Sequence, residues 1–93
     1  MRAAEIDRLA RAVGLRVRAA RKRNGWTSDE LAFRLGASRG GVQSLECGLH
    51  DSRMSTIYTV ARVLGVEPAE LLPTDDEIKS ATPSEFRRRY NGG

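Results

Sequence analysis

The 93-residue sequence is poor in the side chains that build disulfides, metal centres and catalytic sites. It contains one cysteine, Cys47, and one histidine, His50, so an internal disulfide is excluded and a metal cluster lacks ligands. Neither residue has a third group to orient it for nucleophilic catalysis, and no kinase-type or Walker-type phosphate loop is present. We therefore expect no catalytic residues, no metal, no cofactor and no small-molecule substrate.

Long apolar runs are also missing. No segment approaches the roughly 18 consecutive apolar residues of a membrane span. The first residues, MRAAEIDRLARAV, lack the apolar segment and cleavage site of a signal peptide. With only one cysteine, these absences favour a cytoplasmic protein without membrane contact. The length allows one domain, and strand-like alternation is absent, which predicts an all-α fold.

Positive charge is concentrated near the N-terminus. Residues 1–25 contain eight basic and two acidic side chains, residues 26–66 contain four of each, and residues 67–93 have a net charge of −2. A basic patch suits a polyanion, most commonly nucleic acid. An ordinary solvated surface would have the same composition.

The spacing of apolar residues predicts a long first helix from Ala4 to Arg23, ended by Asn24-Gly25. Gly14 lies in its middle and is expected to weaken or bend it. Its apolar stripe consists of Ile6, Leu9, Ala10, Val13, Val17 and Ala20.

Two short helices follow. Thr27 and Glu30 have the spacing of a capping box, and Trp26 and Leu31 that of a hydrophobic staple, so a second helix should start here and end at Gly36. Only Gly36, Ala37 and Ser38 separate it from a third helix, capped by Ser38, anchored by Val42 and Leu45, and stopped at Gly48. This is the pattern of a helix-turn-helix unit over about 27–47, with a recognition helix at about 39–47.

Further helices complete the prediction. The apolar residues Met54, Ile57, Val60, Ala61 and Leu64 have helical spacing and predict a fourth helix. Pro68 begins a short fifth helix, which completes a DNA-binding domain of residues 1–72. Residues 73–93 are a polar tail, in which TDDEIK forms one turn and a short helix spans about 83–90.

The runs VGLRVRAARKRNGWTSDELAFRLGASRGGVQSLECG and MSTIYTVARVLGVEPAELL resemble the phage repressor and Cro type, or Xre-like, helix-turn-helix family. The resemblance covers about residues 13–72. It implies a lambda-repressor-like domain of five helices, here with an N-terminally extended first helix and a short C-terminal tail helix. It also implies an ion pair between Arg21 and Glu46.

The resemblance implies a sequence-specific regulator that binds double-stranded DNA with its third helix in the major groove, often as a homodimer. A prokaryotic or phage repressor that occupies an operator, and is nucleoid-associated when bound, is the first hypothesis. A protein-interaction module on the same fold, such as an antitoxin or adaptor, is the alternative.

Residues on the outward side of the third helix are the candidates for base contacts. Arg39 can bind guanine and Gln43 adenine through paired hydrogen bonds, and Ser44 can bind either base, whereas Gly40 offers only backbone. All four could also be ordinary solvated residues.

Phosphate contacts are expected at helix starts and in the loop after the third helix. Thr27, Ser28 and Ser38 lie where exposed amides and the helix dipole favour an anion. The resemblance adds the loop residues His50, Ser52 and Arg53, although His50 could equally be an ordinary solvated loop residue.

The consecutive Gly40 and Gly41 are unusual at the start of a recognition helix, since glycine is about 1 kcal/mol less favourable than alanine in a helix. Three interpretations remain open. Base recognition is short or depends partly on DNA shape, the bare backbone approaches DNA closely, or the helix no longer binds DNA.

Several apolar residues are candidates for a protein interface. We expect Phe33, Leu49 and Tyr58 to be exposed, and a cluster of exposed apolar residues indicates an interface. Phe86 and Tyr90, four residues apart, would give the tail helix an apolar face, which could pack on the core or on a second subunit. Phe33 could instead be covered by the chain's own extra segments.

Overall fold

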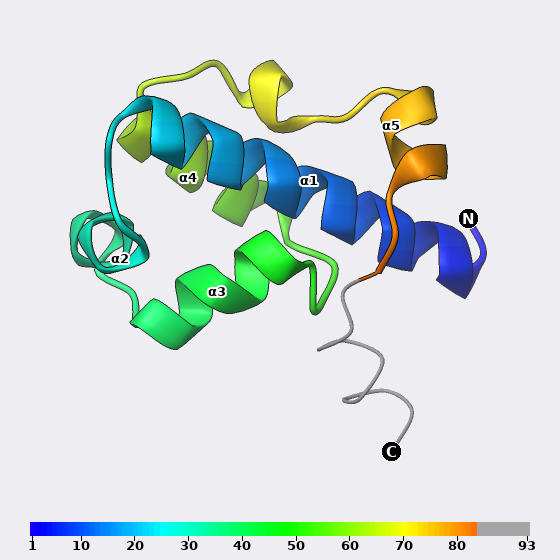
Figure 1. Cartoon of the computed structure of the whole chain (residues 1–93), viewed down its shortest axis with the longest axis horizontal. Helices are drawn as coiled ribbons and strands as arrows, with labels where there is room; N and C mark the ends of the chain where they lie inside the picture. The colour runs from blue at the N-terminus through cyan, green and yellow to red at the C-terminus, as the bar shows by residue number, and fades with distance from the viewer. Residues whose placement is uncertain (84–93) are drawn as a thin grey trace.

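The computed structural model describes residues 1–83, and these residues form helices and no strand. The expected all-helical fold is therefore confirmed, and α1 has the expected N-terminal extension. Figure 1 shows α1 running across the molecule, with α3 on one side of it and η1 and α5 on the other. The elements are α1 (Ala3–Arg23), α2 (Ser28–Leu35), α3 (Arg39–Cys47), α4 (Met54–Leu64), the 3-10 helix η1 (Pro68–Leu71) and α5 (Asp75–Ser80).

A single core joins the five elements from α1 to η1. Its most deeply buried large side chains come one from each element and are Val17, Leu31, Val42, Val60 and Leu71. Most of the apolar stripes predicted from spacing face this core, because a helix buries the side that repeats every three or four residues. Met54 does not: it is 69% exposed, since it lies at the first residue of α4, beyond the edge of the core.

Gly14 does not interrupt α1, which continues through it. A Cβ atom at this position would clash with the carbonyl oxygens of Glu46 and, at 2.5 Å, of Leu45. A Cβ atom at Gly48, which follows α3, would lie 2.5 Å from the backbone nitrogen of Arg11. These two glycines therefore allow the backbone of α1 and the end of α3 to touch, and the expected weak point of α1 is a packing site.

The predicted capping box at Thr27 is only half formed, whereas the predicted short helix at Pro68 is present. Thr27 caps α2 by accepting a hydrogen bond from the amide of Glu30 at 3.1 Å. The reciprocal half of the capping box is absent, because the Glu30 carboxylate accepts a hydrogen bond from Arg34 Nε at 3.0 Å instead. The short helix at Pro68 is a single turn of 3-10 helix.

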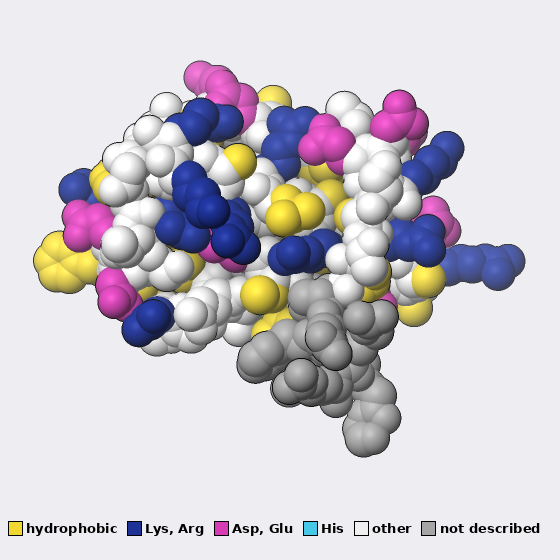
Figure 2. Space-filling model, in the orientation of Figure 1, with side chains coloured by type: hydrophobic (Ala, Val, Ile, Leu, Met, Phe, Trp, Pro, Cys, Tyr) yellow, Lys and Arg dark blue, Asp and Glu magenta, His cyan; other side chains and the backbone are white. Residues whose placement is uncertain are grey.

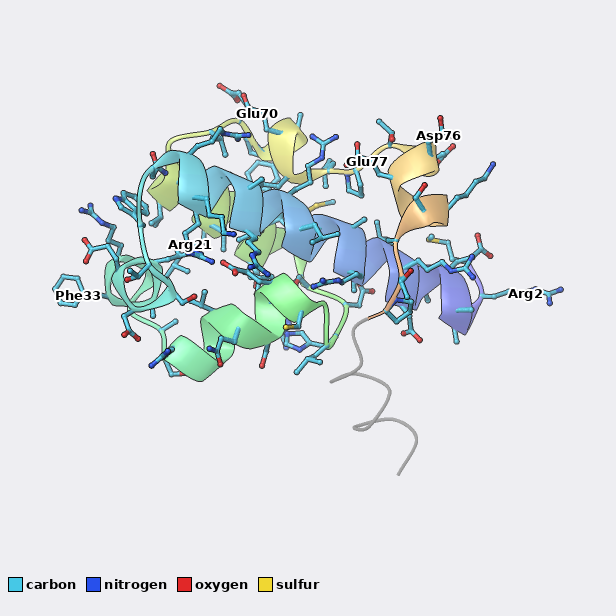
Figure 3. All side chains as sticks on the ribbon, in the orientation of Figure 1. Arg2, Arg21, Phe33, Glu70, Asp76 and Glu77 are labelled. Atoms are coloured by element: carbon cyan, nitrogen blue, oxygen red, sulfur yellow. The ribbon has the colours of Figure 1, made fainter. Side chains whose placement is uncertain are left out.

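Asp75–Ser80 form α5, which packs on α1. Thr74 caps α5, whose six residues exceed the single turn expected. Arg16 of α1 donates from Nε to Glu77 Oε2 at 2.8 Å and from Nη1 to the carbonyl oxygen of Glu70 at 3.0 Å. Figure 3 shows Glu77 and Glu70 on the same side of α1. The tail helix expected over about residues 83–90, apart from Pro83, lies outside the described residues.

Replacing Gly14 with alanine should destabilise the protein although alanine is the better helix former. The new methyl group would collide with backbone, and overpacking of this kind costs about 1–3 kcal/mol, more than the gain in helix propensity of about 1 kcal/mol. Urea unfolding should show a lower midpoint for Gly14→Ala. Ala19→Gly, at an exposed position of the same helix, measures the propensity effect alone. A Gly14→Ala variant more stable than the wild type would contradict the close approach.

The contact between Arg16 and Glu77 should make stability depend on pH. The hydrogen bond from Arg16 lowers the pKa of Glu77 to about 2, against 4.5 for an ordinary glutamate. Ionised Glu77 therefore favours the folded state fully above about pH 4.5, and this contribution disappears as the pH falls towards 2.

Urea unfolding at several pH values should show wild type more stable than Glu77→Gln at pH 7, with the difference shrinking between pH 4.5 and 2. Asp76→Asn, an exposed neighbour in the same turn, should show a much smaller change across this range. A difference between wild type and Glu77→Gln that does not vary with pH would contradict the assignment.

Candidate nucleic-acid interface

The turn between α2 and α3 is built from the residues expected for it. Gly36 ends α2 with a φ of 67°, a conformation that glycine adopts without strain. The Ser38 hydroxyl caps α3 by accepting a hydrogen bond from the Gly41 amide at 3.0 Å. Gly48 ends α3 with a φ of 65°. Both ends of α3 are thus fixed by local hydrogen bonds and backbone geometry.

The inner side of α3 is anchored to α1 by a buried ion pair between Arg21 and Glu46. Arg21 donates from Nε to Glu46 Oε2 at 2.7 Å and from Nη2 to Oε1 at 3.1 Å, and both side chains are about nine-tenths buried. Arg21 also donates from Nη1 to the carbonyl oxygen of Trp26 at 2.8 Å. Its hydrogen bonds to Glu46 raise the pKa of Arg21, although burial opposes this shift. Figure 3 shows Arg21 between α1 and α3.

The outward side of α3 borders a groove that also involves α1 and the start of α2. Gly40 and Gln43 are exposed, and Ser44 and Cys47 are half-buried. We call this hollow the α1-side groove; its lining consists of Arg11, Arg18, Arg21, Ser28, Gly40, Gln43, Ser44, Glu46, Cys47 and Leu49.

Positive charge dominates the α1-side groove. The charges of Arg21 and Glu46 cancel, which leaves those of Arg11 and Arg18. Arg11 donates from Nη1 to the carbonyl oxygen of Glu46 at 2.9 Å. Arg18 is exposed and forms no ion pair within residues 1–83. Figure 2 shows basic side chains gathered between α1 and α3. An anion can therefore approach this groove without displacing a carboxylate from Arg18.

Neither Arg11 nor Arg18 is among the predicted contact residues, although both belong to the N-terminal excess of basic residues. Arg11, Gly14, Arg18 and Arg21 follow one another at steps of three, four and three, which places them on one side of a helix. That spacing was available in the sequence. It did not indicate that this side of α1 lies beside the outward residues of α3.

Arg39 lies at the N-terminal tip of α3 and is about two-thirds exposed. Its Nε is 3.6 Å from Asp29 Oδ1 of α2, and Asp29 is equally exposed. A pair this exposed contributes at most about 1 kcal/mol. The guanidinium is therefore directed by a weak contact and can readily rearrange toward another acceptor.

The residues predicted to contact phosphate lie on both flanks of α3. Ser28 lines the α1-side groove, while Thr27 and Ser38 are exposed caps of α2 and α3. A second hollow, between α3 and α4, is lined on the loop by His50, Asp51, Ser52 and Arg53, and on α3 by Gly41, Val42 and Leu45. We call it the α4-side groove, and α3 forms a ridge between the two.

The predicted interface residues do not behave alike. Phe33 is 83% exposed and Tyr58 is 49% exposed, as expected. Figure 3 shows Phe33 pointing away from the body of the molecule, so no described segment covers it. Leu49 is half-buried and lines the α1-side groove, so the expectation that it is exposed was wrong. Phe86 and Tyr90 lie outside the described residues.

Two other features bear on function. Within residues 1–83, no three His, Cys, Asp or Glu side chains are grouped so that they could hold a metal ion. None of the helices in that range is long and apolar enough to cross a membrane.

The chain is similar to a known protein family and to several known proteins. A family model described as helix-turn-helix matches residues 17–71. An uncharacterized HTH-type transcriptional regulator of Sinorhizobium fredii is 36% identical over 62 residues, which cover 67% of this chain and 80% of the relative. An uncharacterized HTH-type transcriptional regulator of Archaeoglobus fulgidus is 34% identical over 62 residues, covering 67% and 89%.

Two solved structures are also similar. The hypothetical transcription factor NHTF from Neisseria has a TM-score of 0.67 and 30% identity, covering 74% of this chain and 79% of its own. The restriction-modification controller protein C.AhdI from Aeromonas hydrophila has a TM-score of 0.64 and 32% identity, covering 68% and 96%. The extended start of α1 and all of α5 lie outside the segment that the family model matches.

Proposed function

Because the chain belongs to the Xre-like helix-turn-helix family, we propose that it is a transcriptional regulator that inserts α3 into the major groove of operator DNA. The observation that supports this most strongly is the α1-side groove, where the unpaired Arg18 lies beside the exposed Gln43. A DNA duplex offers both partners at once, since its phosphates attract arginine and its base edges accept and donate hydrogen bonds.

The contacts divide by role. Arg39 and Gln43 project from the first turns of α3 and would bind guanine and adenine edges, with Ser44 next to them. The two grooves flank α3, and the two phosphate backbones flank a major groove in the same way. Arg18, Arg11 and Ser28 would hold one backbone, while His50, Ser52 and Arg53 would hold the other. Phosphate contacts then position α3 and base contacts select the sequence.

Regulation of transcription would follow from occupancy of the operator. A bound protein excludes polymerase from an overlapping promoter, which makes repression the direct consequence of operator binding. Helix-turn-helix proteins commonly bind as two-fold dimers whose half-sites are one helical turn apart, so we propose a homodimer on a palindromic site. The working compartment is the cytoplasm, where the DNA is.

The exposed Phe33 favours a second candidate function, a contact with another protein. Its ring is 83% exposed on α2, and it does not line either groove. A single exposed aromatic residue is common on monomeric proteins, whereas the positive charge of the α1-side groove suits the phosphates of DNA. DNA binding is therefore the primary proposal.

The direct test is selection of duplexes from a random pool by the wild-type protein, followed by a salt titration of the winning sequence. We expect enrichment of one sequence with two-fold symmetry and an observed affinity that falls steeply with salt, because phosphate binding releases counterions. A pool that remains unenriched after repeated rounds, with binding insensitive to salt, would refute the proposed function.

Replacing Arg39 and replacing Arg18 should weaken DNA binding in different ways. Arg39→Ala should cost about 1–3 kcal/mol on the selected duplex and relax specificity at one base pair, because it removes a base contact. Arg18→Ala should weaken binding to all duplexes by a similar factor and reduce the salt slope by about 1, because it removes a phosphate contact.

Both variants can be measured by fluorescence anisotropy on the selected duplex, single-base variants of it and a scrambled duplex. Arg62→Ala is the matched control, since Arg62 is an exposed arginine on α4 that lines neither groove. An Arg39→Ala protein that discriminates between these duplexes as the wild type does would show that Arg39 is not a base contact.

A further inference from the structure

Gly40 has no structural reason to be glycine. It lies in α3 with helical backbone and is absent from the positive-φ glycines, which are Gly25, Gly36, Gly48 and Gly65. A Cβ atom at Gly40 would have one neighbour within 4 Å, the Ser38 hydroxyl oxygen at an ordinary 3.9 Å. Alanine would fit and would favour the helix, because it loses less backbone entropy on folding than glycine does.

Five of the other glycines within residues 1–83 are explained by the fold itself. Gly25, Gly36, Gly48 and Gly65 have a positive φ, and Gly14 faces backbone too close for a side chain. Gly41 is intermediate, because a Cβ atom there would lie 3.3 Å from the capping hydroxyl of Ser38. Gly40 is therefore the position where the sequence departs from local preference without a reason inside the described chain, and such departures are expected at functional sites.

Gly40 lies on the outward side of α3, in its first turn. Gln43 and Ser44 are three and four residues further along, which places them directly beside it on the helix surface. All three residues line the α1-side groove together with Arg18. Whatever occupies this groove meets bare backbone at Gly40, between a charged flank and two polar side chains.

We infer that Gly40 is the point at which α3 comes closest to DNA, so that the missing side chain sets how deeply the helix enters the major groove. This inference rests on the proposed function and goes beyond it, since it assigns a role to the absence of a side chain. A methyl group at Gly40 would hold the α3 backbone away from the base edges. The short contacts of Gln43 and Ser44 would lengthen together, because they flank that point.

Nucleic acid is the occupant that the charges favour. Arg18 has no ion-pair partner in the described chain, Arg11 lies in the same groove, and Arg39 stands at the adjacent tip of α3. A protein surface of ordinary composition would not compensate this many cations, whereas each DNA strand has a negative charge at every phosphate.

The adjacent glycine provides a matched control. Gly41 lies about 100° further around the helix, and it lines the α4-side groove instead. Gly40→Ala and Gly41→Ala each add one methyl group to the same turn of α3. They differ in the groove that receives the methyl group.

The experiment measures thermal unfolding and the affinity of wild type and both variants for the duplex selected by the wild-type protein. We expect Gly40→Ala to raise Tm by about 4–8 °C and to weaken binding about tenfold or more, a loss that accompanies a more stable fold. Gly40→Ala should also lose part of its discrimination between single-base variants of the duplex, whereas Gly41→Ala, whose methyl group enters the α4-side groove, should keep the discrimination of the wild type. Loss of affinity in a stabilised variant distinguishes a contact with DNA from damage to the fold.

Three results would count against the inference or its premise, and each is recognisable. Undiminished binding by Gly40→Ala would overturn the inference while leaving the proposed function intact. Equal loss of base discrimination by both alanine variants would also overturn it, because the effect would then belong to the helix as a whole. A wild-type protein that selects no duplex would refute the proposed function itself.

Discussion

The close contact between α1 and α3 determines what the rest of the molecule can present. Gly14 and Gly48 lack side chains where the two backbones meet, and the ion pair between Arg21 and Glu46 joins the helices at the same place. A buried ion pair adds little net stability relative to apolar packing, because both charges lose water. The ion pair does, however, require one relative orientation of the two helices. The contact therefore fixes the orientation of α3 more than it strengthens the fold.

That orientation explains the electrostatics of the candidate interface. The side of α1 that meets α3 also includes Arg11 and Arg18, so the crossing brings these charges beside the outward residues of α3. Arg16 projects from nearly the opposite side of α1, where it binds Glu77 and the carbonyl oxygen of Glu70. The long first helix is thus held from two sides, by α3 on one and by η1 and α5 on the other.

Glycine has different roles along this chain, and only three-dimensional contacts distinguish them. Gly36 and Gly48 end helices in a conformation that other residues rarely adopt. Gly14 is required by a neighbouring backbone, whereas a Cβ atom at Gly40 would meet only the Ser38 hydroxyl at an ordinary distance. A residue that weakens a helix without an internal cause marks a place where an external partner is the natural explanation.

The sequence by itself determined the parts of this structure that depend on neighbours within one turn. Helix stripes, the caps Thr27 and Ser38, and the stops at Gly36 and Gly48 follow from local hydrogen bonding and backbone preference. The family resemblance could be identified from the sequence for the same reason, since its motifs are short runs of neighbouring residues. The Glu30 carboxylate does not bind the amide of Thr27 as predicted, because Arg34, four residues later, donates a hydrogen bond to it instead.

Only the tertiary structure decided which side of each helix meets which neighbour. Helical spacing placed Arg11 and Arg18 on one side of α1, but it could not indicate that α3 lies there. It also could not distinguish Gly14, pressed against another backbone, from Gly40, which is exposed. Such relations arise when several helices pack at once around a shared core, because each helix then has one orientation that satisfies all the others.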